Sequence, residues 1–257
     1  MASVLTYLVQ INVLFAILTI GYYLLLRKLT FYKLNRIYFL GGILFSLVYP
    51  FLPQHLVFKP KALGGSNIIN YSYFIHKEEG LLSDSWTIGQ GFVVLLLIVG
   101  AVFVLKFIIQ LCAIWRIYRH SEHYAWGRFL FRNVRFPIAP FSFLQHIYVH
   151  KPMHEEEALQ NILEHESVHV EGRHTVDMLF TELLLACCWY NPFVWMLRHA
   201  MRQNLEFLTD EQVLAQGVNR QNYQYALLLE TQQCAKVGIA NNFNYKQLKT
   251  RISMMNK

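Results

Sequence analysis

The chain of 257 residues is 54% hydrophobic, with a mean hydropathy of +0.27. This apolar content exceeds that of ordinary soluble domains, so it excludes a typical soluble globular protein and predicts a membrane protein. The formal net charge of +7 falls largely in clusters beside the apolar segments, where membrane topology and contact with anionic lipid explain it. Membrane lipid is therefore an expected partner, and nucleic acid is not.

Three long apolar segments in the first 115 residues predict three transmembrane helices. The first, about residues 2–26, has no charged residue and is long enough to cross a hydrocarbon core of about 30 Å. A signal peptide is the competing interpretation, but the segment lacks a basic start and a small-residue cleavage site. The second span, about 37–52, is shorter and contains two glycines, whereas the third, about 87–110, is the clearest of the three.

The charges of the loops predict the orientation, because short segments rich in Lys and Arg stay in the cytosol. Four basic residues and no acidic one lie between the first two spans, and five arginines follow the third. The loop 53–86 has balanced charges and suits the outer side. We therefore expect an outside amino terminus, a transmembrane region at 1–115 and a cytosolic domain at 116–257.

A helix predicted over residues 159–170 carries the pattern H-E-x-x-H. His165 and His169 are four residues apart, so their imidazoles lie on one face of the helix and can share a single Zn²⁺ ion. Glu166 leans toward the open coordination position, where a carboxylate can take a proton from water on the metal and later pass it to the leaving amine. The alternative is that two surface histidines merely flank a solvated glutamate.

A third ligand must come from elsewhere in the chain. The helical stretch 201–214 offers Glu206 and Asp210, which are four residues apart and share one face. Glu206 is the candidate ligand, and Asp210 suits the role of orienting a ligand histidine through its other ring nitrogen. The alternative for this pair is an ordinary solvated acidic face beside Glu211.

Residues 178–197, between these two helices, are mostly apolar and resemble a fourth span. A single crossing would place Glu206 on the opposite side of the membrane from His165, where the two could not bind one metal. The ligand hypothesis therefore predicts a helical hairpin that turns at Asn191 and Pro192. Aromatic residues near this turn favour a membrane-associated hairpin over a cytosolic core element.

Three motifs follow one another in the order HESVHVEGRHTVD, WYNPFVW and NLEFLTDEQVL. They resemble the peptidase region of the BlaR/MecR-type membrane metallopeptidases (metallopeptidase family 56), in motif detail over about residues 147–214. That family pairs two histidines with a glutamate in an E-x-x-x-D segment after an N-P turn, which maps onto His165, His169, Glu206 and Asp210. The resemblance implies a mainly α, multi-pass protein of the bacterial inner (cytoplasmic) membrane, with a cytosolic gluzincin-like zinc peptidase domain.

The chain departs from the family pattern in two places. Many members carry an aspartate five residues after the second histidine, where this chain has His174, with Asp177 a turn further on. Either residue can take over the orienting role, although both also suit a helix start; Arg173 and His174 are candidate donors to the reaction's oxyanion. Sensor members also continue into another span and an extracellular sensor domain, whereas this sequence stops at Lys257, so no residue in it supports β-lactam sensing.

The resemblance implies a zinc endopeptidase that cuts a cytosolic protein, such as a transcriptional repressor, or itself, in transmembrane signalling. A first alternative is a quality-control or processing protease similar to the HtpX/Ste24-type enzymes, whose substrates would be membrane proteins. A second is a non-catalytic membrane transducer with a structural zinc site, although such a site has no use for Glu166. A cytosolic protein substrate is the expected partner, homodimerisation stays open, and residues 219–257 have no assigned role.

Overall fold

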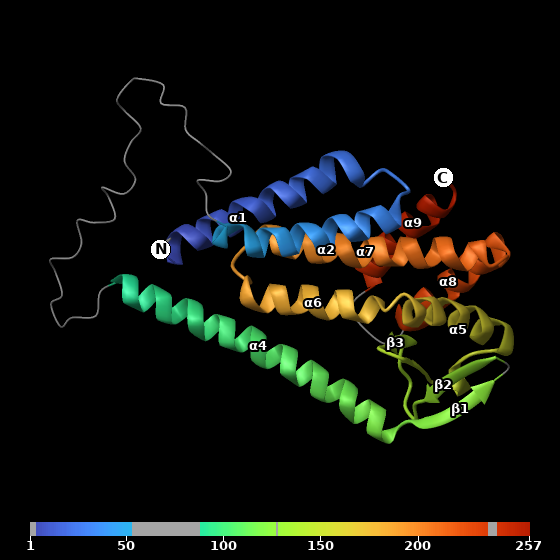
Figure 1. Ribbon diagram of the computed structural model, residues 1–257. Helices are drawn as coiled ribbons and strands as arrows, with labels where there is room; N and C mark the ends of the chain where they lie inside the picture. Colours follow the sequence, from blue (N-terminus) through green and yellow to red (C-terminus); the bar gives the residue numbers. More distant parts are fainter. Residues whose placement is uncertain (1–3, 53–87, 127, 236–240) are drawn as a thin grey trace, which may run out of the picture.

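The computed structural model describes residues 4–52, 88–126, 128–235 and 241–257, and these are mostly helical (Figure 1). The predicted loop 53–86 lies outside the described residues. The helices are α1 (Val4–Gly21), α2 (Tyr32–Val48), α4 (Ile88–His120), α5 (Glu156–Glu171), α6 (His174–Cys187), α7 (Pro192–Ala215), α8 (Arg220–Ala235) and α9 (Asn241–Met255). Short helical turns are η1 (Tyr22–Leu26), η2 (Tyr49–Phe51) and η5 (Lys151–Met153). The mainly α class is confirmed.

Three of these helical segments are long and apolar enough to cross a membrane: Tyr7–Leu26, Tyr32–Phe51 and Val93–His120. The three predicted N-terminal spans are therefore present as helices. The second begins earlier than predicted, and α4 continues without a break to His120. The basic residues in the last turns of α4 do not end the helix, because arginine is a good helix former and its charge suits a helix carboxyl end.

Helices α6 and α7 form an antiparallel hairpin that turns where the sequence predicts. Asn191 caps α7 by accepting a hydrogen bond from the Phe193 backbone N–H (2.8 Å), and Pro192 occupies the first helical position. At the tip, the Asn191 amide donates to Asn12 Oδ1 of α1 (2.6 Å), and Trp189 stacks on Phe103 of α4. The tip therefore lies beside residues inside two candidate membrane spans.

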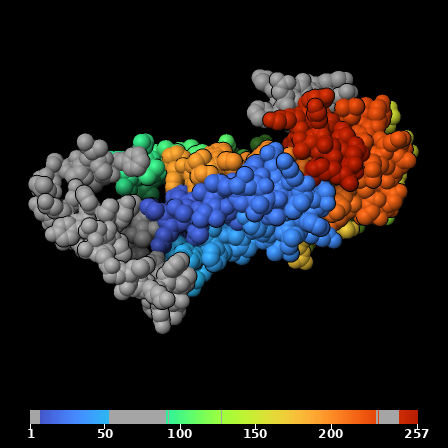
Figure 2. Space-filling model, turned by 90° about the horizontal axis from the view of Figure 1, so that it is seen from above, coloured from blue at the N-terminus to red at the C-terminus, as the bar shows by residue number. Residues whose placement is uncertain are grey.

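The largest hydrophobic core joins this hairpin to the first two helices. In Figure 2, α1 and α2 lie side by side over much of one face of the molecule, with α9 next to them at one end. The buried residues of this core include Ile11, Phe15, Leu18, Phe39, Ile43, Leu197, Met201 and Leu205. The α7 backbone, and Glu206 with it, is thus held against α1 and α2.

A small sheet that the sequence analysis did not predict precedes α5. Its strands are β1 (Glu122–Trp126), β2 (Phe129–Asn133), β3 (Phe141–Phe143) and β4 (His146–Val149), in the order β1-β2-β4-β3. β2 and β4 are parallel, and the other pairs are antiparallel. Helix α5 packs on the sheet through a separate core, formed by Phe131, Ile147, Val149, Leu159, Ile162 and Leu163. The sheet therefore fixes the helix that carries H-E-x-x-H.

Candidate metal centre

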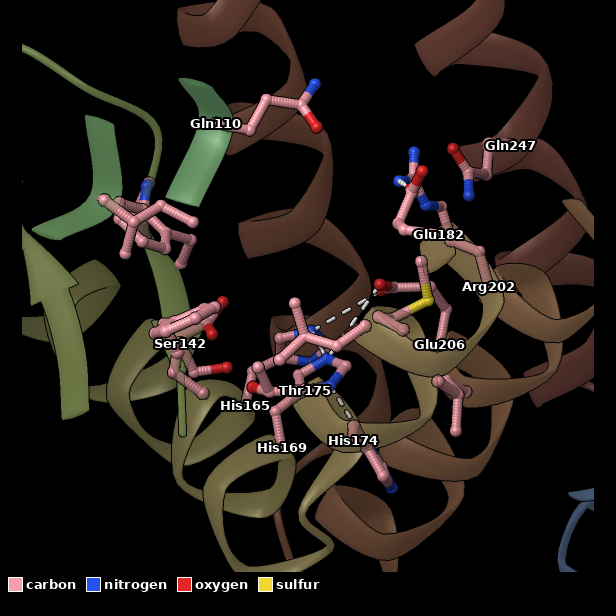
Figure 3. Close-up of a pocket in the computed structure, with 18 of the residues that line it drawn as sticks. Gln110, Ser142, His165, His169, His174, Thr175, Glu182, Arg202, Glu206 and Gln247 are labelled. Carbon is pink, nitrogen blue, oxygen red and sulfur yellow. Dashed lines mark hydrogen bonds and ion pairs between the residues drawn. The ribbon is translucent and has the colours of Figure 1, made fainter. Parts of the chain in front are cut away.

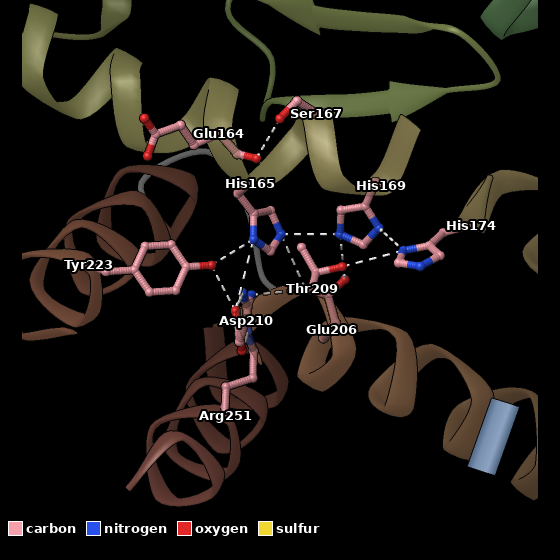
Figure 4. A network of polar contacts seen from close by, with 10 residues as sticks. All are labelled: Glu164, His165, Ser167, His169, His174, Glu206, Thr209, Asp210, Tyr223 and Arg251. Carbon is pink, nitrogen blue, oxygen red and sulfur yellow. Dashed lines mark hydrogen bonds and ion pairs between the residues drawn. The ribbon is translucent and has the colours of Figure 1, made fainter. Parts of the chain in front are cut away.

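Helix α5 presents both motif histidines to the interior. His165 is 8% exposed, and the Nε2 atoms of His165 and His169 lie 3.1 Å apart (Figure 4). Each neutral imidazole offers a lone pair from its unprotonated nitrogen, so two such atoms at this distance suit a shared cation. This placement agrees with the predicted pairing of the two side chains on one face of the helix.

Glu206 returns to these histidines on α7. Its Oε2 lies 3.6 Å from His165 Nε2, and its Oε1 lies 3.9 Å from His169 Nε2. The three ligand atoms lie within 4.8 Å of one another, while donors around a tetrahedral zinc ion stand about 3.3 Å apart. Two imidazoles and one carboxylate also match the donor set of catalytic zinc sites, so these residues fit one zinc ion.

The surroundings of the site hold Glu206 ionised and His169 neutral, the forms that bind a metal. Burial raises the pKa of Glu206, but the positive charge of Arg251 and the contacts with both histidines outweigh it and lower that pKa. Burial, together with neighbouring His165 and His174, lowers the pKa of His169 to about 3. For His165 burial lowers the pKa, but the hydrogen bond and charge of Glu206 prevail and raise it.

Tyr223, on α8, orients the first histidine. Its hydroxyl donates to Asp210 Oδ1 (2.8 Å) and lies 2.7 Å from His165 Nδ1, so it accepts a hydrogen bond from that nitrogen when the imidazole carries its proton there. This tautomer leaves Nε2 of His165 unprotonated and directed toward His169 and Glu206. Asp210 thus lies on the predicted side of His165 and reaches it through Tyr223.

Arg251, on α9, connects the two carboxylates of α7. Its guanidinium lies 3.0 Å from Glu206 Oε2 and donates two hydrogen bonds to Asp210, at 2.9 and 2.5 Å. The sequence analysis missed both Tyr223 and Arg251. No spacing rule could have found them, because they approach the site only through the packing of α8 on α5 and of α9 on α7.

His174 lies behind the second histidine, at the start of α6. Its Nδ1 is 2.9 Å from His169 Nδ1 and 3.3 Å from the Thr209 hydroxyl. Burial and the charge of Arg36 lower the pKa of His174 to about 4, so the ring is neutral at pH 7 and can accept a hydrogen bond from His169. This contact suits an orienting role better than donation to an oxyanion.

The other two predicted site residues lie further from the ligands. Arg173 occupies the turn between α5 and α6 with a left-handed backbone (φ 53°) and is not among the residues that line the cavity described next. Asp177 forms an ion pair with Arg36 of α2 (2.6 Å). Neither side chain is brought to the face of the site that Glu166 occupies.

A cavity of about 570 Å³ opens in front of the histidines (Figure 3). Glu166, which is 8% exposed, lines it together with His165, His169 and Glu206. The opposite walls come from α4, through residues such as Phe107 and Gln110, and from β3, through Phe141, Ser142 and Phe143. A substrate placed in this cavity would contact Glu166 and the ligand triad at the same time.

A two-histidine, one-glutamate triad beside a glutamate such as Glu166, together with the three candidate membrane helices of the described residues, is typical of a membrane metallopeptidase. The family model described as BlaR1 peptidase M56 matches residues 137–255, so this part of the chain is similar to the peptidase of that family. The match confirms the predicted resemblance and extends it over α8 and α9. A search of curated proteins finds no match.

Proposed function

We propose that this protein is a membrane-bound zinc endopeptidase that hydrolyses peptide bonds of a cytosolic protein, such as a transcriptional repressor, or of itself, in transmembrane signalling. The observation that carries the proposal is the position of Glu166, which lines the same cavity as His165, His169 and Glu206. A structural metal site is closed by its ligands, whereas here a carboxylate and a cavity lie beside the triad.

The proposed mechanism assigns one task to each group. His165, His169 and Glu206 would hold a zinc ion, which supplies Lewis acidity toward the scissile carbonyl and the attacking water. Glu166 accepts the proton of that water and then delivers it to the leaving amine. Tyr223 and His174 hold the ligand imidazoles in orientation, through the hydrogen bonds described above.

The edge strand β3 supports a polypeptide as the substrate. In the described sheet β3 pairs with β4 alone, and its residues line the cavity beside Glu166. A free strand edge offers backbone N–H and C=O groups to which an extended peptide can add as a further strand. Such pairing would hold the main chain of the substrate next to the triad, whatever side chains the substrate carries.

The predicted topology belongs to the same proposal: a transmembrane region at 1–115, with the amino terminus outside, and a cytosolic peptidase domain at 116–257 in a bacterial inner membrane. The contacts of Asn12 with Asn191 and of Phe103 with Trp189 support insertion of the hairpin tip among the spans. The basic residues before α2 and at the end of α4 support a cytosolic position for the metal centre.

A quality-control or processing protease is the second candidate function. The observation that favours it is that α4, a candidate membrane span, forms one wall of the cavity through Phe107, Gln110 and Leu111. A membrane-anchored substrate could reach the cavity along this helix. Cleavage of a membrane-anchored peptide in preference to its soluble counterpart would favour this candidate.

Metal analysis and proteolysis of the purified full-length protein test the proposal. We expect about one zinc per chain, and we expect Glu166→Gln to keep the zinc but cleave fluorogenic peptides about 10²–10⁴-fold more slowly, because it removes the proton acceptor. Glu164→Gln is the matched control, since Glu164 is a buried glutamate of the same helix that faces Arg128. Wild-type rates in Glu166→Gln, or wild-type protein without zinc, would contradict the proposal.

A further inference from the structure

Arg36, near the start of α2, contacts the turn that follows the H-E-x-x-H helix. Its Nη2 donates to the Gly172 carbonyl (2.8 Å), and its Nε lies 2.6 Å from Asp177 Oδ2. Gly172 ends α5, and Asp177 lies in the first turn of α6. One side chain of a candidate membrane helix therefore holds both ends of the α5–α6 turn.

The turn that Arg36 holds determines where His174 stands. A side chain at Gly172 would begin 2.5 Å from His174 Nε2, so the imidazole packs directly against this backbone. Arg173, which lies between Gly172 and His174, has a left-handed backbone, and a different conformation of the turn would require this backbone to change. Because His174 Nδ1 lies 2.9 Å from His169 Nδ1, a displaced turn would also displace the hydrogen-bond partner of a metal ligand.

Burial makes the ion pair a strict constraint on the turn. The Asp177 side chain is 5% exposed and that of Arg36 is 25% exposed. A buried carboxylate that loses its cationic partner is costly, so the pair resists separation. Arginine also suits this position by its shape, because its planar fork reaches a carbonyl and a carboxylate at once.

We propose that Arg36 is a positioning residue of the metal centre, which acts through the α5–α6 turn and His174 on His169. This inference rests on the proposed function, because it requires that the triad of His165, His169 and Glu206 binds zinc. The chain of contacts runs from α2 through Gly172 and Asp177 to His174 and then to the ligand.

Zinc affinity of the full-length protein in nanodiscs, measured by competition with a chromogenic chelator, tests this proposal. We expect Arg36→Gln to weaken zinc binding about 10–100-fold, the range typical of a lost partner of a metal ligand. The ligand-field absorption of the Co²⁺-loaded protein should change as well. Lys33→Gln, which removes an exposed positive charge from the same helix, should change neither. Arg36→Lys should lie between wild type and Arg36→Gln.

A double-mutant cycle tests the route through His174. If Arg36 acts through that ring, Arg36→Gln should weaken zinc binding no further in a His174→Ala background. Additive losses, or wild-type affinity in Arg36→Gln, would overturn the inference while leaving the proposed function intact. A wild-type protein that binds no zinc would overturn both. Should Arg36→Gln fail to fold, Arg36→Gln combined with Asp177→Asn removes both charges together, and the same loss of affinity is expected.

Discussion

The three candidate membrane spans pack in two different ways. In α1 and α2, 28% of each apolar window is buried against the rest of the protein, whereas none of the α4 window is buried. The hydropathies run the opposite way, at 1.9 and 1.3 for the first two windows and 2.7 for the third. The most apolar helix is therefore the least enclosed, and in Figure 1 it diverges from the α1–α2 pair.

Polar side chains explain the difference. Thr19 and Asn35 are buried inside the first two helices, and the Thr19 hydroxyl donates to the Phe193 carbonyl (3.3 Å). Lipid cannot satisfy such groups, so helices that bury them associate with partners, whereas Lys106 and Gln110, polar residues within the candidate span of α4, are exposed. The α1–α2 pair is thus packed against the rest of the protein, whereas α4, which forms one wall of the cavity, is largely exposed.

The largest expected effect on stability is the loss of a core side chain in the packed pair. Phe39→Ala should lower the free energy of unfolding by about 3 kcal/mol, because Phe39 is fully buried and its ring contacts Tyr22. Ile98→Ala on α4, where the side chain is 57% exposed, is the control and should change little. Unfolding by denaturant in mixed micelles measures both. Equal losses would mean that α4 is packed as tightly as α2.

A smaller effect is expected from filling the close approach of α1 and α2. A Cβ at Gly42 would lie 2.2 Å from Leu18 Cδ1, whereas at neighbouring Gly41 it meets nothing within 4 Å. Gly42→Leu should therefore cost about 1–3 kcal/mol through overpacking, and Gly41→Leu should cost far less. Thermal unfolding of the two variants under the same conditions checks this. A greater loss for Gly41→Leu would show that the helices meet on another face.

The smallest effect concerns the hydrogen bond at the hairpin tip. Asn12 and Asn191 should show a coupling of about 0.6 kcal/mol in a double-mutant cycle of alanine variants, the average for polar pairs between membrane helices. The free energy of unfolding of the two single variants and the double variant gives this value. Independent effects of the two substitutions would show that the tip does not rest on α1.

The sequence predicted the parts of the site that follow from local spacing. His165 and His169 had to share a face, and the demand that Glu206 meet them predicted the turn at Asn191 and Pro192, which the structure contains. The sheet before α5 was missed, because strands of three to five residues are too short to show a periodic pattern. The extension of α4 to His120 was missed because charged residues were taken as the end of a span.

The sequence by itself determined the three apolar helices, the H-E-x-x-H motif and the hairpin that brings Glu206 back to this motif. These features depend on the length of an apolar run and on the period of a helix, and residues close together in the sequence determine both. Only the tertiary structure decided which side chains contact the candidate ligands, Tyr223 and Arg251 from the last two helices, and that Arg36 of α2 contacts the turn after the H-E-x-x-H helix. Their positions depend on how helices that are far apart in the sequence pack together. A hydrogen bond between two such helices forms only when all the contacts that orient the helices are in place.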